Sequence, residues 1–169
     1  MSSNAVADYC STLPVFEVAL PEGDNKASYD LVLKPVPADD GVDQYWPLYH
    51  EADEGEQFGN MLFKFNGKNG KFTLNISLDL SEVAGAKFVD NSGNLDGIVG
   101  LSPNFKHEFK SKVVSGSNGT QLEITIKNKD KKKDPDPSKD AFSFLWLCES
   151  ATIGGQFKSG DPEAHIEPQ

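Results

Sequence analysis

The sequence contains no arginine: all 16 of its basic residues are lysine. The planar guanidinium group, which grips a carboxylate or phosphate with two parallel hydrogen bonds, is therefore absent. The 26 acidic residues outnumber the lysines and give a formal net charge of −10. Binding to phosphate polymers and anionic lipids depends on positive charge, so we expect neither a nucleic acid nor a membrane surface as a partner.

The sequence also has few cysteines and no long apolar run. Cys10 and Cys148 are too few for a secreted disulfide framework, and neither lies in a C-x-x-C pair or a zinc spacing, which leaves open whether they pair with each other. No segment approaches the ~20 apolar residues of a membrane span, and the first residues lack the basic and apolar regions of a signal peptide. We expect a cytoplasmic protein, with secretion as the alternative.

The dominant positive signal is an alternation of apolar and polar residues with a period of two. It runs through 61–65 and 72–80, and the Asn- and Gly-rich residues 66–70 between them predict a β-hairpin. It recurs in 105–113 and 122–126, which predict a second hairpin. In each case one face is apolar and must pack against another layer, while the other face is polar.

Further short strands bring the expected number to eight to ten. The segment 141–149 is apolar on both faces, which is typical of a strand in the middle of a sheet. We therefore predict an all-β protein with little helix: an antiparallel β-sandwich of the jelly-roll or Ig-like kind. We expect one domain over 1–169, with flexible termini at 1–12 and 161–169.

The segment 127–140 contains six lysines and four aspartates. Its two Asp-Pro steps disfavour helix, and charge runs between strands usually increase solubility and discourage edge-to-edge pairing. We interpret it as a solvated connection. The alternative is an electrostatic docking site for an acidic partner.

The first candidate site is the aromatic segment 45–50, with Tyr45, Trp46, Tyr49 and His50. It holds three of the six Tyr and Trp residues of the chain. Flat aromatic faces beside hydrogen-bonding groups are typical of carbohydrate-binding sites. The competing interpretation places Trp46 and Tyr49 in the core, and it is the commoner outcome because aromatic rings supply the most apolar burial per residue.

A second candidate is a calcium loop at Asp90, Asn94 and Asp96, where oxygen-bearing side chains stand at alternate positions. The match to a calcium-loop pattern fails twice. Gly97 falls at the eighth place instead of the sixth, and Leu101 occupies the twelfth place, which requires a glutamate. An acidic hairpin turn is the simpler interpretation, so we expect no cofactor, with Ca²⁺ as the alternative.

No catalytic motif occurs: the chain has no P-loop, no G-x-S-x-G elbow and no histidine spacing typical of a metal site. We therefore expect a non-catalytic binding or interaction module with a carbohydrate or protein partner. One alternative is a structural or self-assembling protein that forms homo-oligomers through strand edges. A second alternative is a small hydrolase that uses paired carboxylates, although no pair is singled out.

Overall fold

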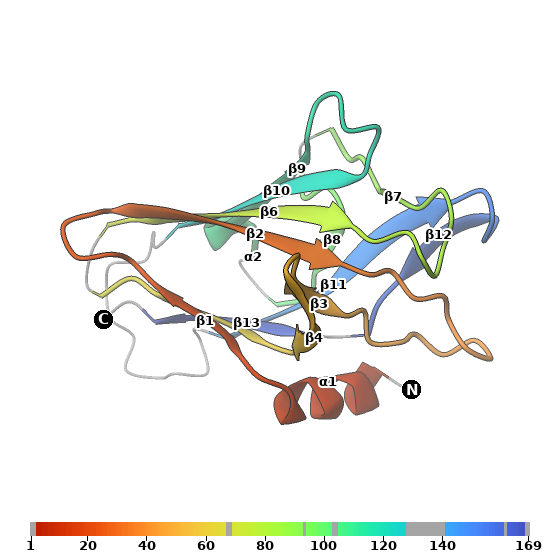
Figure 1. Ribbon diagram of the computed structural model, residues 1–169, viewed down its shortest axis with the longest axis horizontal. Helices are drawn as coiled ribbons and strands as arrows, with labels where there is room; N and C mark the ends of the chain where they lie inside the picture. The colour runs from red at the N-terminus through yellow and green to blue at the C-terminus, as the bar shows by residue number, and fades with distance from the viewer. Residues whose placement is uncertain are drawn as a thin grey trace.

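Two β-sheets form two layers, with the helix α1 beneath the lower layer (Figure 1). The computed structural model describes residues 3–66, 69–92, 94–102, 105–127, 141–160 and 162–167. One sheet has the strand order β1-β5-β13-β11-β12, and β7 and β8 also pair with β11. The other sheet has the order β4-β3-β2-β6-β10-β9.

The described residues form thirteen strands and two helices, more and shorter strands than we predicted. In chain order they are α1 (Ser3–Thr12), β1 (Phe16–Ala19), β2 (Lys26–Leu33), β3 (Leu48–His50), β4 (Asp53–Phe58), β5 (Met61–Lys64), β6 (Lys71–Leu78), β7 (Lys87–Phe88), β8 (Ile98–Gly100), α2 (Phe105–Glu108), β9 (Phe109–Val113), β10 (Gln121–Lys127), β11 (Ala141–Ser150), β12 (Gly155–Lys158) and β13 (Glu163–Glu167).

The all-β sandwich is confirmed, but its sheets are mixed where we predicted purely antiparallel ones. β2 pairs with β6 in parallel, and β5 pairs in parallel with both β1 and β13. In each parallel pair other strands intervene along the chain, as the long connection between parallel strands requires. Some strands that follow each other directly, such as β5 and β6, lie in different sheets.

The predicted first hairpin is wrong for this reason. β5 lies in one sheet and β6 in the other, so the two strands face each other across the core instead of pairing edge to edge. Ring contacts across the interior show the arrangement: Phe72 of β6 lies 5.4 Å from Phe63 and 5.0 Å from Phe65. Alternation correctly identified the apolar face of each strand, but it carries no information about which sheet the strand joins.

The predicted second hairpin and the central strand are confirmed. β9 and β10 pair antiparallel, although residues 105–108 form α2 instead of extending β9. β11 lies inside its sheet and pairs with β7, β8, β12 and β13 along its length. Phe142, Phe144, Leu145, Trp146 and Cys148 of this strand are buried, whereas Leu147 is partly exposed.

Structure is also present at both ends of the chain. β13 lies between β5 and β11 inside a sheet, although we expected a flexible C-terminal segment. At the other end, α1 buries Val6 and Cys10. Two glycines let α1 pack closely against the rest of the protein. A Cβ added to Gly59 would lie 2.0 Å from the carbonyl oxygen of Cys10, and one added to Gly160 would lie 2.4 Å from the side chain of Val6.

Both cysteines are free and buried, one in α1 and the other in β11, so the two thiols do not pair. Neither helix of the described chain has the length and apolar character that a membrane crossing requires. The charged segment 127–140, apart from Lys127, lies outside the described residues.

Candidate binding groove

The aromatic segment 45–50 is mostly packed inside the protein. Trp46 is 2% exposed, and its indole ring lies 5.2 Å from the ring of Phe157 in β12. Tyr45 is half-buried and donates a hydrogen bond of 2.7 Å from its hydroxyl to the backbone carbonyl of Phe58. The burial of Trp46 agrees with the competing interpretation, which placed it in the core.

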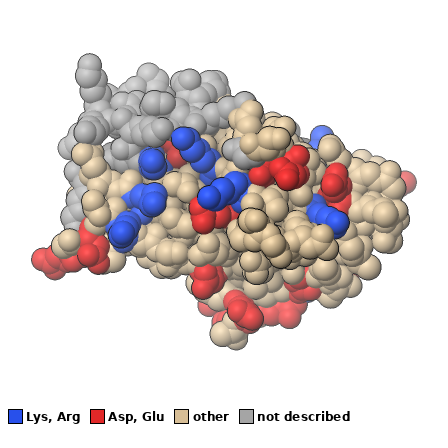
Figure 2. Space-filling view, turned by 90° about the horizontal axis from the view of Figure 1, so that it is seen from above, with Lys and Arg blue, Asp and Glu red and all other residues tan. Residues whose placement is uncertain are grey.

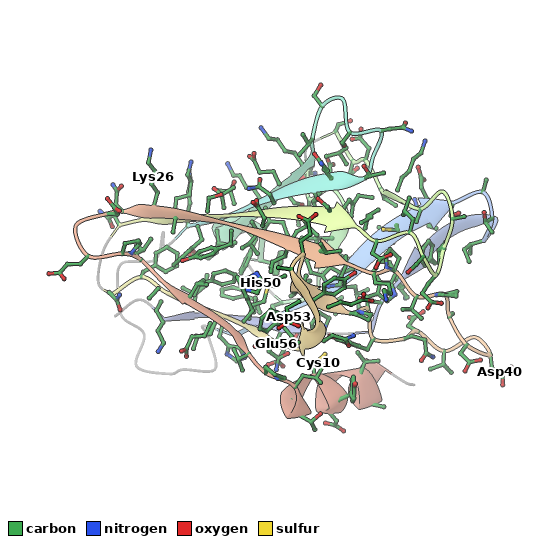
Figure 3. The ribbon with its side chains drawn as sticks, viewed as in Figure 1. Cys10, Lys26, Asp40, His50, Asp53 and Glu56 are labelled. Atoms are coloured by element: carbon green, nitrogen blue, oxygen red, sulfur yellow. The ribbon has the colours of Figure 1, made fainter. Side chains whose placement is uncertain are left out.

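The other two residues of the segment lie in β3. His50 is exposed, and its ring packs 5.4 Å from Phe58 (Figure 3). Tyr49 is buried beneath the ion pair that Lys34 forms with Glu54, whose Nζ–Oε1 distance is 2.5 Å. The sequence therefore grouped four residues that the structure separates into core, sheet face and surface.

Tyr49 belongs to a polar network that links β2, β3, β4 and the end of β6. Its hydroxyl donates a hydrogen bond of 2.5 Å to Asp79, and Lys34 lies 3.8 Å from the same carboxylate. The pKa of Asp79 is lowered, mainly by this hydrogen bond and to a smaller extent by the nearby lysine. The pKa of Tyr49 is raised, mainly by burial and also by its contact with Asp79. At neutral pH the pair is a phenol and a carboxylate. A carboxyl group whose pKa is lowered is deprotonated at neutral pH and has no proton to donate as a general acid, so the network fits a structural role better than hydrolysis.

The three candidate calcium ligands do not converge. Asp96 is buried, and its two carboxylate oxygens accept hydrogen bonds from the backbone N–H groups of Asn91, at 2.6 Å, and Val113, at 2.9 Å. Asp90 accepts a hydrogen bond from the backbone N–H of Ser92, as expected for an acidic turn. Nowhere in the described ranges do three His, Cys, Asp or Glu side chains gather as a metal site would require.

Two cavities of about 630 Å³ and 410 Å³ lie at β11 and β12, on the sheet that also contains β7 and β8. Leu147 of β11 and Gln156 of β12 line both of them. We call the two cavities together the β11–β12 groove. Its larger part is lined by Val89, Asn91, Asn94, Leu95, Ile98, Val99, Gly100, Ser102 and Phe105, and its smaller part by Pro37, Ala38, Asp43, Ile153, Phe157 and Lys158.

The walls of the groove combine apolar side chains with amide groups. Asn94 and Gln156 are exposed, so their amides face solvent at the groove. In the larger cavity none of the described lining residues is ionisable. In the smaller one, Lys158 and Asp43 lie 3.9 Å apart and compensate each other's charge. The groove therefore suits a ligand that has apolar surfaces, hydrogen-bonding groups and little charge.

The loop between β7 and β8 forms one wall and is held in a strained conformation. Ser92 and Leu95 adopt positive φ angles of 58° and 54°, which side-chain-bearing residues rarely do. Asp96 fastens this loop to β9 through the contacts described above. An added Cβ at Gly97 would lie 2.7 Å from the ring of Phe88, so only glycine fits where the loop returns to the sheet. Strain of this kind persists only where the surrounding structure enforces it.

Sequence reasoning did not find the groove. Asn91, Leu95, Leu147 and Gln156 are far apart in sequence and meet only because β11 pairs with both β8 and β12. The exposed Ile153, beside the Gly154-Gly155 turn, was the one local sign of an apolar surface there.

No family model matches this chain, and no curated protein matches it in sequence.

Proposed function

We propose that this protein is a non-catalytic binding module that holds an extended ligand of low charge in the β11–β12 groove, and that the ligand is an oligosaccharide. The observation that carries the proposal is the pair of neighbouring cavities, since Leu147 and Gln156 line both of them. Successive units of a chain would occupy successive cavities.

The chemistry of the walls supports a sugar. Amide groups such as those of Asn94 and Gln156 donate and accept hydrogen bonds, as sugar hydroxyls also do. Apolar side chains such as Leu95 and Leu147 offer surfaces for the C–H faces of a sugar ring. The absence of an acid or base among the described lining residues of the larger cavity favours binding over hydrolysis there.

The test is a titration of the protein with a panel of neutral oligosaccharides, in which isothermal titration calorimetry measures the binding. Gln156→Ala removes one amide from both cavities and is expected to weaken binding by about fivefold, the equivalent of one lost hydrogen bond. Gln121→Ala, at an exposed position in β10 on the other sheet, is the matched control and should bind as the wild type does. The proposal is wrong if no neutral sugar binds, or if Gln156→Ala and Leu147→Ser bind a sugar as tightly as the wild type.

A second candidate function is self-assembly, and the charges at the two edges of the six-stranded sheet favour it. The edge strand β4 exposes Asp53, Glu54 and Glu56, while the opposite edge strand β9 exposes Lys110 and Lys112. An acidic edge of one copy and a basic edge of the next are complementary, and such head-to-tail contacts extend into a chain of copies.

Sedimentation velocity tests this alternative. Edge pairing predicts a mass that rises with protein concentration at low salt and returns to that of a monomer at high salt, because salt screens the edge charges. Lys110→Glu should prevent assembly, whereas Lys26→Glu, inside the same sheet, should not. A monomer at every concentration and salt level would exclude edge pairing.

A further inference from the structure

Three lysines lie side by side across the outer face of the six-stranded sheet. Lys26 of β2 is directly opposite Lys71 of β6, and Lys71 is directly opposite Lys127 of β10. All three side chains are exposed. Neighbouring strands are about 4.8 Å apart, so this arrangement, the lysine row, places three like charges in a line at short intervals. Lys26 projects from the sheet at this end of the molecule (Figure 3).

The lysine row differs from four other lysines of the described chain in that it has no acidic partner among the described residues. Lys34, Lys64, Lys112 and Lys158 each lie within 4.0 Å of a carboxylate. No such ion pair joins a lysine of the row to another residue in the described ranges. Like charges directly opposite each other destabilise a sheet, and here two such pairs adjoin in a protein whose net charge is −10. Repulsion within the row therefore lowers the free energy of unfolding, and a bound anion would reduce this repulsion.

A row of hydroxyl groups lies beside the lysine row on the same face. Ser28, Thr73 and Thr125 follow one another across β2, β6 and β10, and Lys110 of β9 stands opposite Thr125 at the end of this line. Figure 2, which looks onto this sheet, shows lysine side chains gathered on one half of the face. Within the strands, the acidic residues Asp30 and Glu123 stand in the next row, beside Asn75, and the exposed Glu22 and Asp24 lie in the loop that precedes β2.

We propose that the lysine row and the hydroxyl row together form a docking surface for an anionic polysaccharide, whose carboxylate or sulfate groups contact the lysines and whose hydroxyl groups contact the serine and threonines. The strand spacing is close to the length of one sugar unit, so successive units of such a chain meet successive strands. This surface lies on the sheet opposite the β11–β12 groove and does not depend on the function proposed for that groove.

The face is less suited to other polyanions. Single-stranded nucleic acids stack their bases on exposed aromatic rings, and Tyr49 of β3, an aromatic residue on the outer face of this sheet, is only 5% exposed. A planar anionic membrane would also meet Asp30 and Glu123, two rows from the lysines, and the excess negative charge of the whole chain. A single glycan chain needs only the width of the two rows.

The test measures binding of the full chain to polygalacturonate and to heparin, with dextran as an uncharged control. Lys71→Gln removes the central charge of the row, and Lys112→Gln is the matched control because it lies on the same face but pairs with Glu123 at 3.8 Å. We expect Lys71→Gln to weaken binding about fivefold and to lower the slope of log affinity against log salt by about 1. Lys112→Gln should retain most of the affinity.

A second measurement separates a binding role from a structural one. Without ligand, Lys71→Gln should raise the unfolding temperature at low salt, because it relieves repulsion within the row. A variant that binds less but is more stable supports the proposal. The proposal is overturned if Lys71→Gln lowers the unfolding temperature, if neither glycan binds, if Lys71→Gln and Lys112→Gln bind equally, or if single-stranded DNA, phosphatidylserine vesicles or polyglutamate bind as tightly as the glycans.

Discussion

The indole ring of Trp46 lies 5.2 Å from the ring of Phe157, with an angle of 46° between their planes. Trp46 precedes β3 in the core, whereas Phe157 belongs to β12 and lines the smaller cavity of the β11–β12 groove. This contact connects the groove to the interior. The aromatic residue that the sequence suggested as a ligand platform instead supports the strand that forms the wall of the groove.

Replacement of Trp46 by alanine should therefore destabilise the fold. Removing a fully buried tryptophan from a core costs about 3–5 kcal/mol, since it leaves a cavity and loses apolar burial. Urea unfolding followed by circular dichroism measures the change. Tyr9→Ala is a useful control, because Tyr9 is 37% exposed and makes one edge contact with Tyr45, so about 1 kcal/mol is expected. Equal effects of the two variants would contradict the buried position of Trp46.

Fluorescence provides an independent check on the same residue. In a Trp146→Phe variant, Trp46 is the only indole, and its burial predicts blue-shifted emission and weak quenching by acrylamide. Unfolding in urea should shift the emission to the red and make quenching strong. Quenching in the folded protein as efficient as that of the unfolded chain would place Trp46 at the surface and return the aromatic segment to the list of ligand sites.

The sequence predicted which face of a strand is buried better than it predicted which strands pair. Phe72, Leu74 and Ile76 were assigned to an apolar face, and all three are buried. Alternation gives this result because successive side chains of a strand point to opposite sides. The pairing of β6 with β2, in parallel, was not predictable, because it depends on where the chain crosses between layers and not on the pattern within a strand.

The environment of the aromatic segment was not predictable for a related reason. The density of aromatic residues around Trp46 was visible in the sequence, but whether a ring faces solvent depends on what covers it, and Phe157 is more than a hundred residues away. The β11–β12 groove and the lysine row were both invisible for the same reason. Lys26, Lys71 and Lys127 each stand at the end of an ordinary strand, and only the register of three strands brings them together.

The Tyr49–Asp79 hydrogen bond makes stability depend on pH in a defined direction. The pKa of Asp79 is lowered in the folded state, so ionised Asp79 adds to the free energy of unfolding above the ordinary aspartate pKa of about 3.9. This contribution is lost as the pH falls through the pKa that Asp79 has in the folded protein. Asp79→Asn should cost about 1 kcal/mol at neutral pH. The difference from the wild type should shrink in acid. Urea unfolding at a series of pH values measures both quantities.

At the alkaline end the same pair gives the opposite slope. The pKa of Tyr49 is raised in the folded state by burial and by Asp79, so its contribution is complete below the ordinary tyrosine pKa of about 10 and is lost above it. Tyr49→Phe should flatten the loss of stability at high pH. A double-mutant cycle of Tyr49→Phe and Asp79→Asn isolates the pair, and a coupling energy of zero at neutral pH would contradict the hydrogen bond.

The docking of α1 can be tested through its cysteine. Burial raises the pKa of the Cys10 thiol to about 11 and also raises that of Cys148, so both should react slowly with a thiol reagent in the folded protein. Cys10 should react first, because α1 has no strand pairing and opens at lower free energy than β11, which is paired with four strands. Mass spectrometry after timed labelling distinguishes the two sites.

Gly59→Ala should accelerate the labelling of Cys10 without a matching change at Cys148. The added methyl group would lie 2.0 Å from the Cys10 carbonyl oxygen, a distance that only displacement of α1 can relieve. Gly55→Ala is the matched control, since the nearest atom to its added Cβ is an Asp53 carboxylate oxygen at 3.4 Å and this part of β4 is exposed. If Gly59→Ala and Gly55→Ala label Cys10 at the same rate, α1 is not held by the close contact at Gly59. If Gly59→Ala accelerates both cysteines equally, the substitution has loosened the whole sandwich, and the helix does not open separately from it.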